Sequence, residues 1–231
     1  MSSEKRRIRN DVIMIGSIVA LIVLGVRLFS DRRYTLVSMM IAFLACFFFY
    51  LTYEKKEGSI RRMVMIAVMT TITVISRLIF GVVPGFKPMS AIIILTGIFM
   101  GPECGFLVGS LSALTSNIFF GQGPWTPFQM LSWGLIGIIG GFCRSMQGKI
   151  LPMIIGFLAT VFVYGPILNF ASLLLVTNTP TWNGFWMMEA SGFLFDVVHG
   201  VSTIVFVYFA WKPMRKKLVR MQEKYGICRR K

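Results

Sequence analysis

The feature that most constrains this chain is a series of long apolar segments, separated by short joints that carry charges, glycine or proline. A membrane-spanning helix needs about 20 consecutive apolar residues, so a chain of 231 residues has room for about eight spans and little else. We therefore expect an all-α, polytopic membrane helical bundle without a soluble catalytic domain. The expected spans are residues 11–29, 34–53, 62–82, 88–101, 102–121, 126–143, 150–176 and 188–211.

The charged residues support a membrane protein and orient its spans. They make up only 14% of the chain, against about 25% in ordinary soluble domains. If both termini are cytoplasmic, 19 of the 24 Lys and Arg residues fall on the inner side, as the positive-inside rule favours. Because the basic clusters flank apolar segments, we expect contact with lipid headgroups of the cell (plasma) membrane and no binding of nucleic acid.

The chain divides into three parts by composition. Residues 1–58 are expected to form a basic N-terminal segment and an accessory transmembrane hairpin, residues 59–211 a six-span substrate-binding core, and residues 212–231 a basic cytoplasmic tail. Most of the glycines lie in the core, often four residues apart, a spacing that lets helix backbones approach closely. The span at 88–101 is short, so irregular backbone at 85–88 should be buried in protein.

Signatures of catalysis are absent from the sequence. The glycine–lysine pair at 148–149 fails the phosphate-loop pattern, and four scattered cysteines with one histidine make neither a disulfide framework nor a zinc site. The only acids in the core are Glu103, Glu189 and Asp196, which argues against self-powered, ion-coupled transport. We expect a protein that is not an enzyme and needs no metal or cofactor.

Three junctions on the predicted outer side carry polar and aromatic residues that could bind a ligand. Trp125, Gln129 and Trp133 are spaced four residues apart, so they can share one helical face. Tryptophan combined with amides suits a flat or large organic ligand better than a bare ion. Asn178 and Asn183 lie in the same junctions. The candidate substrate-binding residues are Arg77, Lys87, Asn117, Gln122, Trp125, Gln129, Trp133, Trp182, Trp186 and Glu189.

Structural roles compete with ligand binding at several of these positions. Trp182 and Trp186 also fit the aromatic belt of a membrane–water interface. Arg77 could instead reach the interface or pair with Glu189 or Asp196. Asp196 and His199 lie three residues apart, and a structural hydrogen bond within the bundle is the favoured reading of that pair.

The stretch from Arg61 to Trp211 resembles the substrate-binding S component of energy-coupling factor (ECF) vitamin transporters. The resemblance rests on six compact spans, on a small-residue step at Ala67 and Thr71, and on the run from Asn117 to Met130, NIFFGQGPWTPFQM, followed by glycines at 134–141. The family has two alanines at this step, where this chain has Ala67 and Thr71. The extra N-terminal hairpin is also a departure, and no role is assigned to it.

The resemblance implies a high-affinity vitamin binder that takes its ligand from outside. Its expected partners are a transmembrane coupling protein, which docks at Ala67 and Thr71, and two cytoplasmic ATPases that supply the energy. The GPWTP variant at 123–127 favours cobalamin as the ligand, and riboflavin or another heterocyclic vitamin is the alternative. An autonomous secondary transporter and a membrane scaffold protein are the competing functions.

Overall fold

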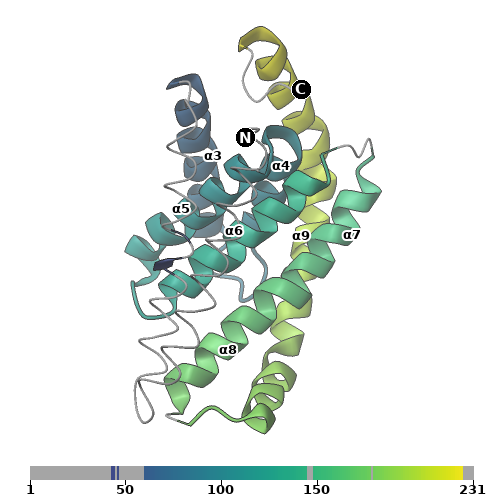
Figure 1. Ribbon diagram of the computed structural model, residues 1–231. Coiled ribbons are helices and arrows are strands. Elements are labelled where there is room, and N and C mark those ends of the chain that lie inside the picture. Colours follow the sequence, from purple (N-terminus) through teal and green to yellow (C-terminus); the bar gives the residue numbers. More distant parts are fainter. Residues whose placement is uncertain (1–42, 45, 47–59, 145–147, 178, 226–231) are drawn as a thin grey trace, which may run out of the picture.

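The structure is a computed structural model that describes residues 43–44, 46, 60–144, 148–177 and 179–225. Helices are the only regular elements in these ranges, so the expected all-α fold is confirmed (Figure 1). The accessory hairpin of residues 1–58 lies outside them, apart from three helical residues between 43 and 46. The count of eight spans and the cytoplasmic termini therefore stay predictions. The elements are α3 (Ile60–Ile79), α4 (Met89–Met100), α5 (Pro102–Phe120), α6 (Thr126–Phe142), α7 (Ile150–Ala159), the π-helical turn η1 (Thr160–Tyr164), α8 (Gly165–Val176) and α9 (Trp182–Tyr225).

Within the described residues, four helical stretches are long and apolar enough to cross a membrane: Ile60–Ile79, Pro102–Phe120, Ile150–Val176 and Trp182–Lys224. The chain is therefore a multi-pass membrane protein. The helices of the core agree with the expected spans except at α9. The last span was predicted at 188–211, yet the helix begins six residues earlier and continues to Tyr225. Strong helix formers after Pro213 carry it onward, and Leu218 is buried against the bundle.

Glycines bring α4, α5 and α6 into backbone contact, as their spacing predicted. Gly101 has a φ of 96°, which lets the chain reverse between α4 and α5 without a loop. A Cβ at Gly137 would lie 2.7 Å from the backbone nitrogen of Phe106, and closer still to the Gly105 carbonyl group. The three helices therefore form the tightly packed centre of the bundle, with α5 and α6 lying side by side (Figure 1).

The short helix α4 is buried along its whole length. Twelve residues give about 18 Å of helix, well short of a hydrocarbon core of about 30 Å. The irregular segment before it is held against α9: the Lys87 backbone N–H donates to Ser202 Oγ (3.1 Å), and this hydroxyl donates to the Lys87 carbonyl (2.9 Å). The expectation of buried irregular backbone at 85–88 is confirmed for Gly85 and Pro88, while Phe86 and Lys87 are half-buried.

A π-helical turn interrupts the long helix formed by α7 and α8. Pro166 has no N–H to donate, and the Gly165 N–H bonds to the Thr160 carbonyl, five residues back. This turn places Tyr164 in the core, where it is buried against α6 and α9.

Candidate functional site

Arg77 lies in the last turn of α3 and is only 5% exposed. Its Nη1 donates to Ser116 Oγ and to Asn117 Oδ1 (2.9 Å) on α5. The guanidinium carbon lies 5.0 Å from the centroid of the Trp133 ring. Within the described residues no carboxylate pairs with this guanidinium, so the alternative of an ion pair with Glu189 or Asp196 is wrong for this structure.

Asn117 joins Arg77 to the turn between α5 and α6. Its amide nitrogen donates to Gln129 Oε1 (2.7 Å) and to Thr126 Oγ1 (3.0 Å). Thr126 Oγ1 in turn donates to Gln122 Oε1 (3.0 Å). The structure therefore brings four predicted site residues, Arg77, Asn117, Gln122 and Gln129, into one hydrogen-bonded network at one end of the bundle.

Trp133 extends this network into the core. The indole is fully buried, and its N–H donates to Ser90 Oγ (3.2 Å) on α4. The same hydroxyl lies 3.0 Å from His199 Nε2 on α9. The Tyr164 ring lies 4.9 Å from the Trp133 ring and, edge-on, 4.9 Å from the His199 ring. With Arg77 and Asn117, residues from six elements (α3, α4, α5, α6, η1 and α9) thus meet around one aromatic and polar centre.

The centre is rich in positive charge and has open hydrogen-bonding positions. Arg77 Nε and His199 Nδ1 are buried and have no hydrogen-bond partner among the described residues. Lys87 is half-buried, and its ammonium group lies 5.6 Å from the Phe195 ring centroid. The Lys87 backbone N–H donates to Ser202, which follows His199 by about one helical turn. Buried polar atoms without partners call for an explanation. A ligand that offers hydrogen-bond acceptors would satisfy them.

Trp125 stands at the accessible margin of the network. It precedes α6, is 38% exposed, and covers Gly123, where any side chain would collide with the indole ring. Pro124 and Pro127 flank it and restrict the backbone. A rigidly held and partly exposed indole offers a flat apolar surface to a ligand.

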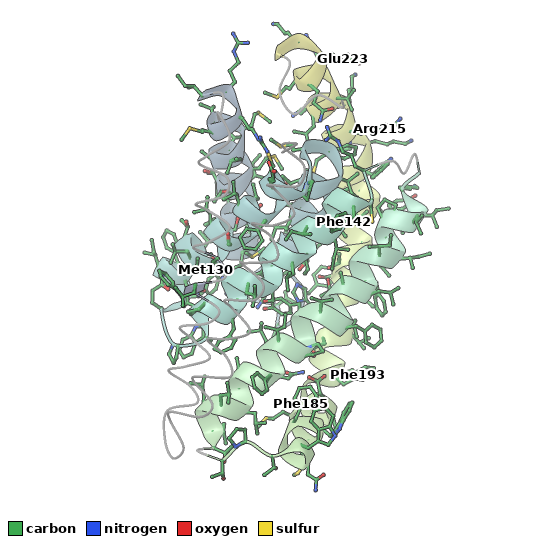
Figure 2. All side chains as sticks on the ribbon, in the orientation of Figure 1. Met130, Phe142, Phe185, Phe193, Arg215 and Glu223 are labelled. Atoms are coloured by element: carbon green, nitrogen blue, oxygen red, sulfur yellow. The ribbon has the colours of Figure 1, made fainter. Side chains whose placement is uncertain are left out.

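The structure places the other predicted residues away from this centre. Trp182 and Trp186 are 71% and 55% exposed, and their ring contacts are with each other and with Phe185. Figure 2 shows Phe185 at the end of the α8–α9 pair, remote from Met130 on α6. The aromatic-belt reading therefore fits both tryptophans better than a shared site. Glu189 follows on the same stretch of α9, Asn183 is exposed there, and Asn178 lies outside the described residues.

Asp196 and His199 each form a hydrogen bond within the bundle, as the favoured reading expected, although not with each other. Asp196 Oδ2 accepts a hydrogen bond from the Asn169 amide (3.0 Å) on α8, whereas His199 faces Ser90. The reason is close helix packing. A side chain at Gly165 would collide with the Asp196 carboxylate, so α8 lies near enough for its Asn169 amide to bond to this carboxylate. Asp196 is structural, and His199 belongs to the candidate site.

Sequence analysis missed Ser90, Ser116 and Tyr164 as members of the site. Hydroxyl groups within otherwise apolar spans were the available signal for the two serines, since such groups need partners in a bilayer. For Tyr164 the available signal was the glycine–proline pair at 165–166, which directly follows the π-helical turn.

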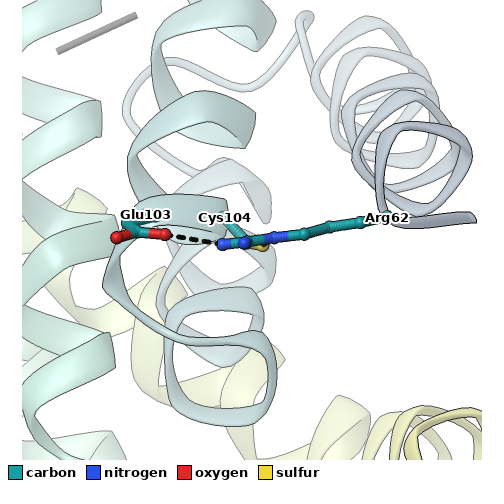
Figure 3. Close-up of polar contacts among 3 residues, drawn as sticks. All are labelled: Arg62, Glu103 and Cys104. Atoms are coloured by element: carbon teal, nitrogen blue, oxygen red, sulfur yellow. Dashed lines mark hydrogen bonds and ion pairs between the residues drawn. The ribbon is translucent and has the colours of Figure 1, made fainter. Parts of the chain in front are cut away.

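The expected partner-docking residues lie on an exposed face of α3. Ala67 and Thr71 are both exposed, with Val64, Val68 and Ile75 beside them. The opposite side of α3 is tied to α5, because Arg62 Nη2 forms an ion pair with Glu103 Oε2 (2.8 Å) and Arg62 Nε donates to Cys104 Sγ (3.2 Å), as Figure 3 shows.

The chain was compared with known families and proteins. The model of one family, the ECF-type riboflavin transporter S component, matches residues 57–216. The match covers α3 to α8 and the larger part of α9, and therefore the whole of the polar and aromatic centre. No curated protein and no solved structure gives a match.

Proposed function

Because the chain belongs to the family of ECF-type riboflavin transporter S components, we propose that it captures a vitamin from outside the cell and delivers it inward with energy from partner ATPases. A member of this family is a membrane transport subunit and not an enzyme. The finer points, which are the ligand, the residues that bind it and the partners, form the proposal.

The observation that carries the ligand proposal is the uncompensated Arg77 beside the Trp133–Tyr164 ring pair. Burial of a guanidinium without a carboxylate is costly, and an electron-rich ligand would offset that cost. Riboflavin offers a flat ring system that stacks on aromatic side chains, and its ring carbonyl groups accept hydrogen bonds from guanidinium and imidazole N–H groups. The sequence analysis favoured cobalamin as the ligand. The description of the matching family favours riboflavin instead.

The proposed binding residues fall into two groups. Arg77, Lys87 and His199 supply the donors, with Ser90 and Asn117 orienting them through the hydrogen bonds described above. Trp125, Gln129 and Trp133 supply the aromatic and amide surface. Trp182 and Trp186 are left out of the proposed site because their ring contacts lie at the far end of the α8–α9 pair. Glu189, whose buried Oε1 has no hydrogen-bond partner among the described residues, is not joined to the Arg77 network and is also left out.

The proposed partners are a transmembrane coupling protein and two cytoplasmic ATPases. The exposed face at Ala67 and Thr71 supports docking of a partner helix, since small side chains allow close helix contact in a bilayer. This face is exposed, whereas Arg77 is buried in the bundle. Ligand binding and partner docking can therefore use separate surfaces of α3.

A binding titration tests the proposal. The purified protein, without ATP, is titrated with riboflavin, and flavin fluorescence reports binding. Cobalamin and the cationic vitamin thiamine serve as comparison ligands. We expect tight binding of riboflavin and weak binding of thiamine, because thiamine carries the same sign of charge as Arg77 and Lys87. Equal affinity for thiamine would refute the role of these cations, and tight binding of cobalamin alone would reverse the choice of vitamin.

A second experiment separates this function from an autonomous secondary transporter. In cells, riboflavin uptake should require the coexpressed coupling protein and ATPases. Uptake into proteoliposomes by this chain alone, driven by an ion gradient, would refute the S-component proposal. A membrane scaffold would bind partners but no vitamin.

A further inference from the structure

A basic hollow of about 530 Å³ lies at the end of the bundle opposite the Trp125 turn. The basic part of α9 forms one wall, and Lys149, just before α7, stands on the other side. Figure 2 shows Arg215 and Glu223 on α9 at this end, with Phe142 of α6 below them. Its lining consists of Lys149, Trp211, Lys212, Arg215, Lys216, Val219, Arg220 and Glu223.

The charge of this hollow is strongly one-sided. Five of its lining side chains are cationic and one is a carboxylate. Within the described residues none of the five forms an ion pair. Lys212, Lys216 and Arg220 are also spaced four residues apart, so like charges stack along one helical face, which destabilises a helix. A bound anion would relieve this repulsion.

The wall that carries these cations is fixed in place. Trp211 is buried and packs on Phe99 of α4, with ring centroids 5.2 Å apart. About two turns beyond, Leu218 is buried, and the Gln222 amide donates to the Phe99 carbonyl. The basic segment is therefore docked on the bundle, and its exposed cationic side chains surround the hollow on a backbone held against α4.

The surroundings of the hollow suit a molecule with both a charged and an apolar part. The Lys149 ammonium lies 3.6 Å from the centroid of the Tyr208 ring, at the level where the apolar part of α9 gives way to its basic part. From this level toward the centre of the bundle, α7 exposes Ile150 and Ile154, and α9 exposes Phe209. Acyl chains can lie along such side chains while a headgroup occupies the hollow.

We propose that this hollow binds the phosphate-bearing headgroup of an anionic phospholipid from the cytoplasmic leaflet. The shared chemistry is that of a phosphate ester, which Lys and Arg side chains bind through charge-assisted hydrogen bonds. Basic hollows beside transmembrane helices are suited to such headgroups. The site is distinct from the vitamin site, and neither proposal depends on the other.

Native mass spectrometry of the full-length protein in detergent tests this assignment. Phosphatidylglycerol and phosphatidylcholine are titrated separately, and the lipid-bound fractions are compared. The matched pair of variants is Lys216→Gln, which alters the hollow, and Lys217→Gln, which removes the same charge from the adjacent exposed residue outside it. Circular dichroism is used to check that both variants remain folded.

We expect phosphatidylglycerol to bind more tightly than phosphatidylcholine. Lys216→Gln should weaken phosphatidylglycerol binding about fivefold, as expected for one charge near a headgroup, and adding Arg215→Gln should weaken it by a similar factor again. Lys217→Gln should leave it unchanged. Equal losses in the two single variants would overturn the proposal, because the attraction would then be diffuse.

A competition experiment distinguishes a lipid headgroup from a phosphate in solution. Inorganic phosphate is added to the protein loaded with phosphatidylglycerol. If the lipid remains bound at millimolar phosphate, the lipid assignment is supported. Displacement of the lipid at that concentration would overturn it in favour of a small soluble anion.

Discussion

The replacement of Gly137 by alanine is the sharpest test of the packing that holds the candidate site. Gly137 on α6 faces Gly105 on α5, and the backbones touch there. A Cβ at this position would lie 2.7 Å from the Phe106 nitrogen and nearer still to the Gly105 carbonyl group. Ordinary contacts between heavy atoms are about 3.5–4.0 Å, so α5 and α6 must part by about 1 Å or more. No flexible side chain is available to move instead.

Two opposing effects set the size of the change. Overpacking costs about 1–3 kcal/mol, and a clash between two backbones belongs at the upper end. Alanine offsets about 1 kcal/mol through its higher helix propensity. The free energy of unfolding should therefore fall by about 2 kcal/mol. On the scale of soluble domains of this length, that corresponds to a melting temperature lower by about 4–8 °C.

A thiol-reactive dye can follow the melting of the purified protein in detergent, because Cys104 and Cys143 are buried free thiols. The control is Gly148→Ala, since a Cβ at Gly148 has no neighbour within 4 Å. This control should melt within about 2 °C of the unaltered protein, as expected for a surface substitution that changes stability by less than about 0.5 kcal/mol.

Coupling between the facing glycines gives a further check. The double variant Gly105→Ala/Gly137→Ala should be less destabilised than the sum of the single variants, because one substitution already separates the helices. If Gly137→Ala melts at the same temperature as Gly148→Ala, the backbone contact does not exist in the protein. The account of how α5 and α6 position Asn117 and Gln129 would then be wrong.

Further predictions concern ligand binding and coupling. Arg77→Lys keeps the charge but loses the forked geometry, so the riboflavin titration should show affinity lowered tenfold or more, whereas Arg61→Lys at the other end of α3 should not change it. Trp125→Ala should weaken riboflavin binding about three- to tenfold through the lost aromatic contact, and melting of this partly exposed site should stay the same; unchanged affinity would exclude Trp125 from the site. Ala67→Leu should preserve binding but abolish uptake in cells that express the partners, with the exposed Ala190→Leu as the control; normal uptake would show that the partner docks elsewhere. Arg62→Gln breaks an ion pair whose side chains are 20% and 27% exposed, so the melting temperature should fall by only a few degrees, since such a pair contributes about 1 kcal/mol or less.

The sequence was sufficient to identify the class of fold. Apolar segments of spanning length can only be helices in a bilayer, because every backbone polar group must be satisfied within the segment. Glycines four residues apart likewise indicated close helix packing, which Gly105 and Gly137 confirm. The short span at 88–101 and the buried Gly85 and Pro88 before it followed from length alone.

Part of the candidate site was also predictable, because Asn117 near the end of α5, Gln122 in the following turn and Gln129 in the first turn of α6 lie close together in the sequence. Local spacing decides which of these side chains can meet. The ligand contacts predicted for Trp182, Trp186 and Glu189 stay predictions. These residues share a predicted side of the membrane with Trp125, but the length and direction of α8 and α9 carry them away from it.

The partners of the charged side chains were decided only by the tertiary structure. The sequence left open whether Asp196 would lie beside His199 or pair with Arg77. In the structure α8 lies close to the Asp196 carboxylate at Gly165, and the Asn169 amide donates a hydrogen bond to this carboxylate. Arg77 is left with Asn117 and Ser116, and His199 with Ser90. The sequence by itself determined that helices would cross the membrane and where glycines would let them touch. Which polar groups meet between those helices depends on their relative rotation and depth, which contacts distant in sequence set and no local pattern encodes.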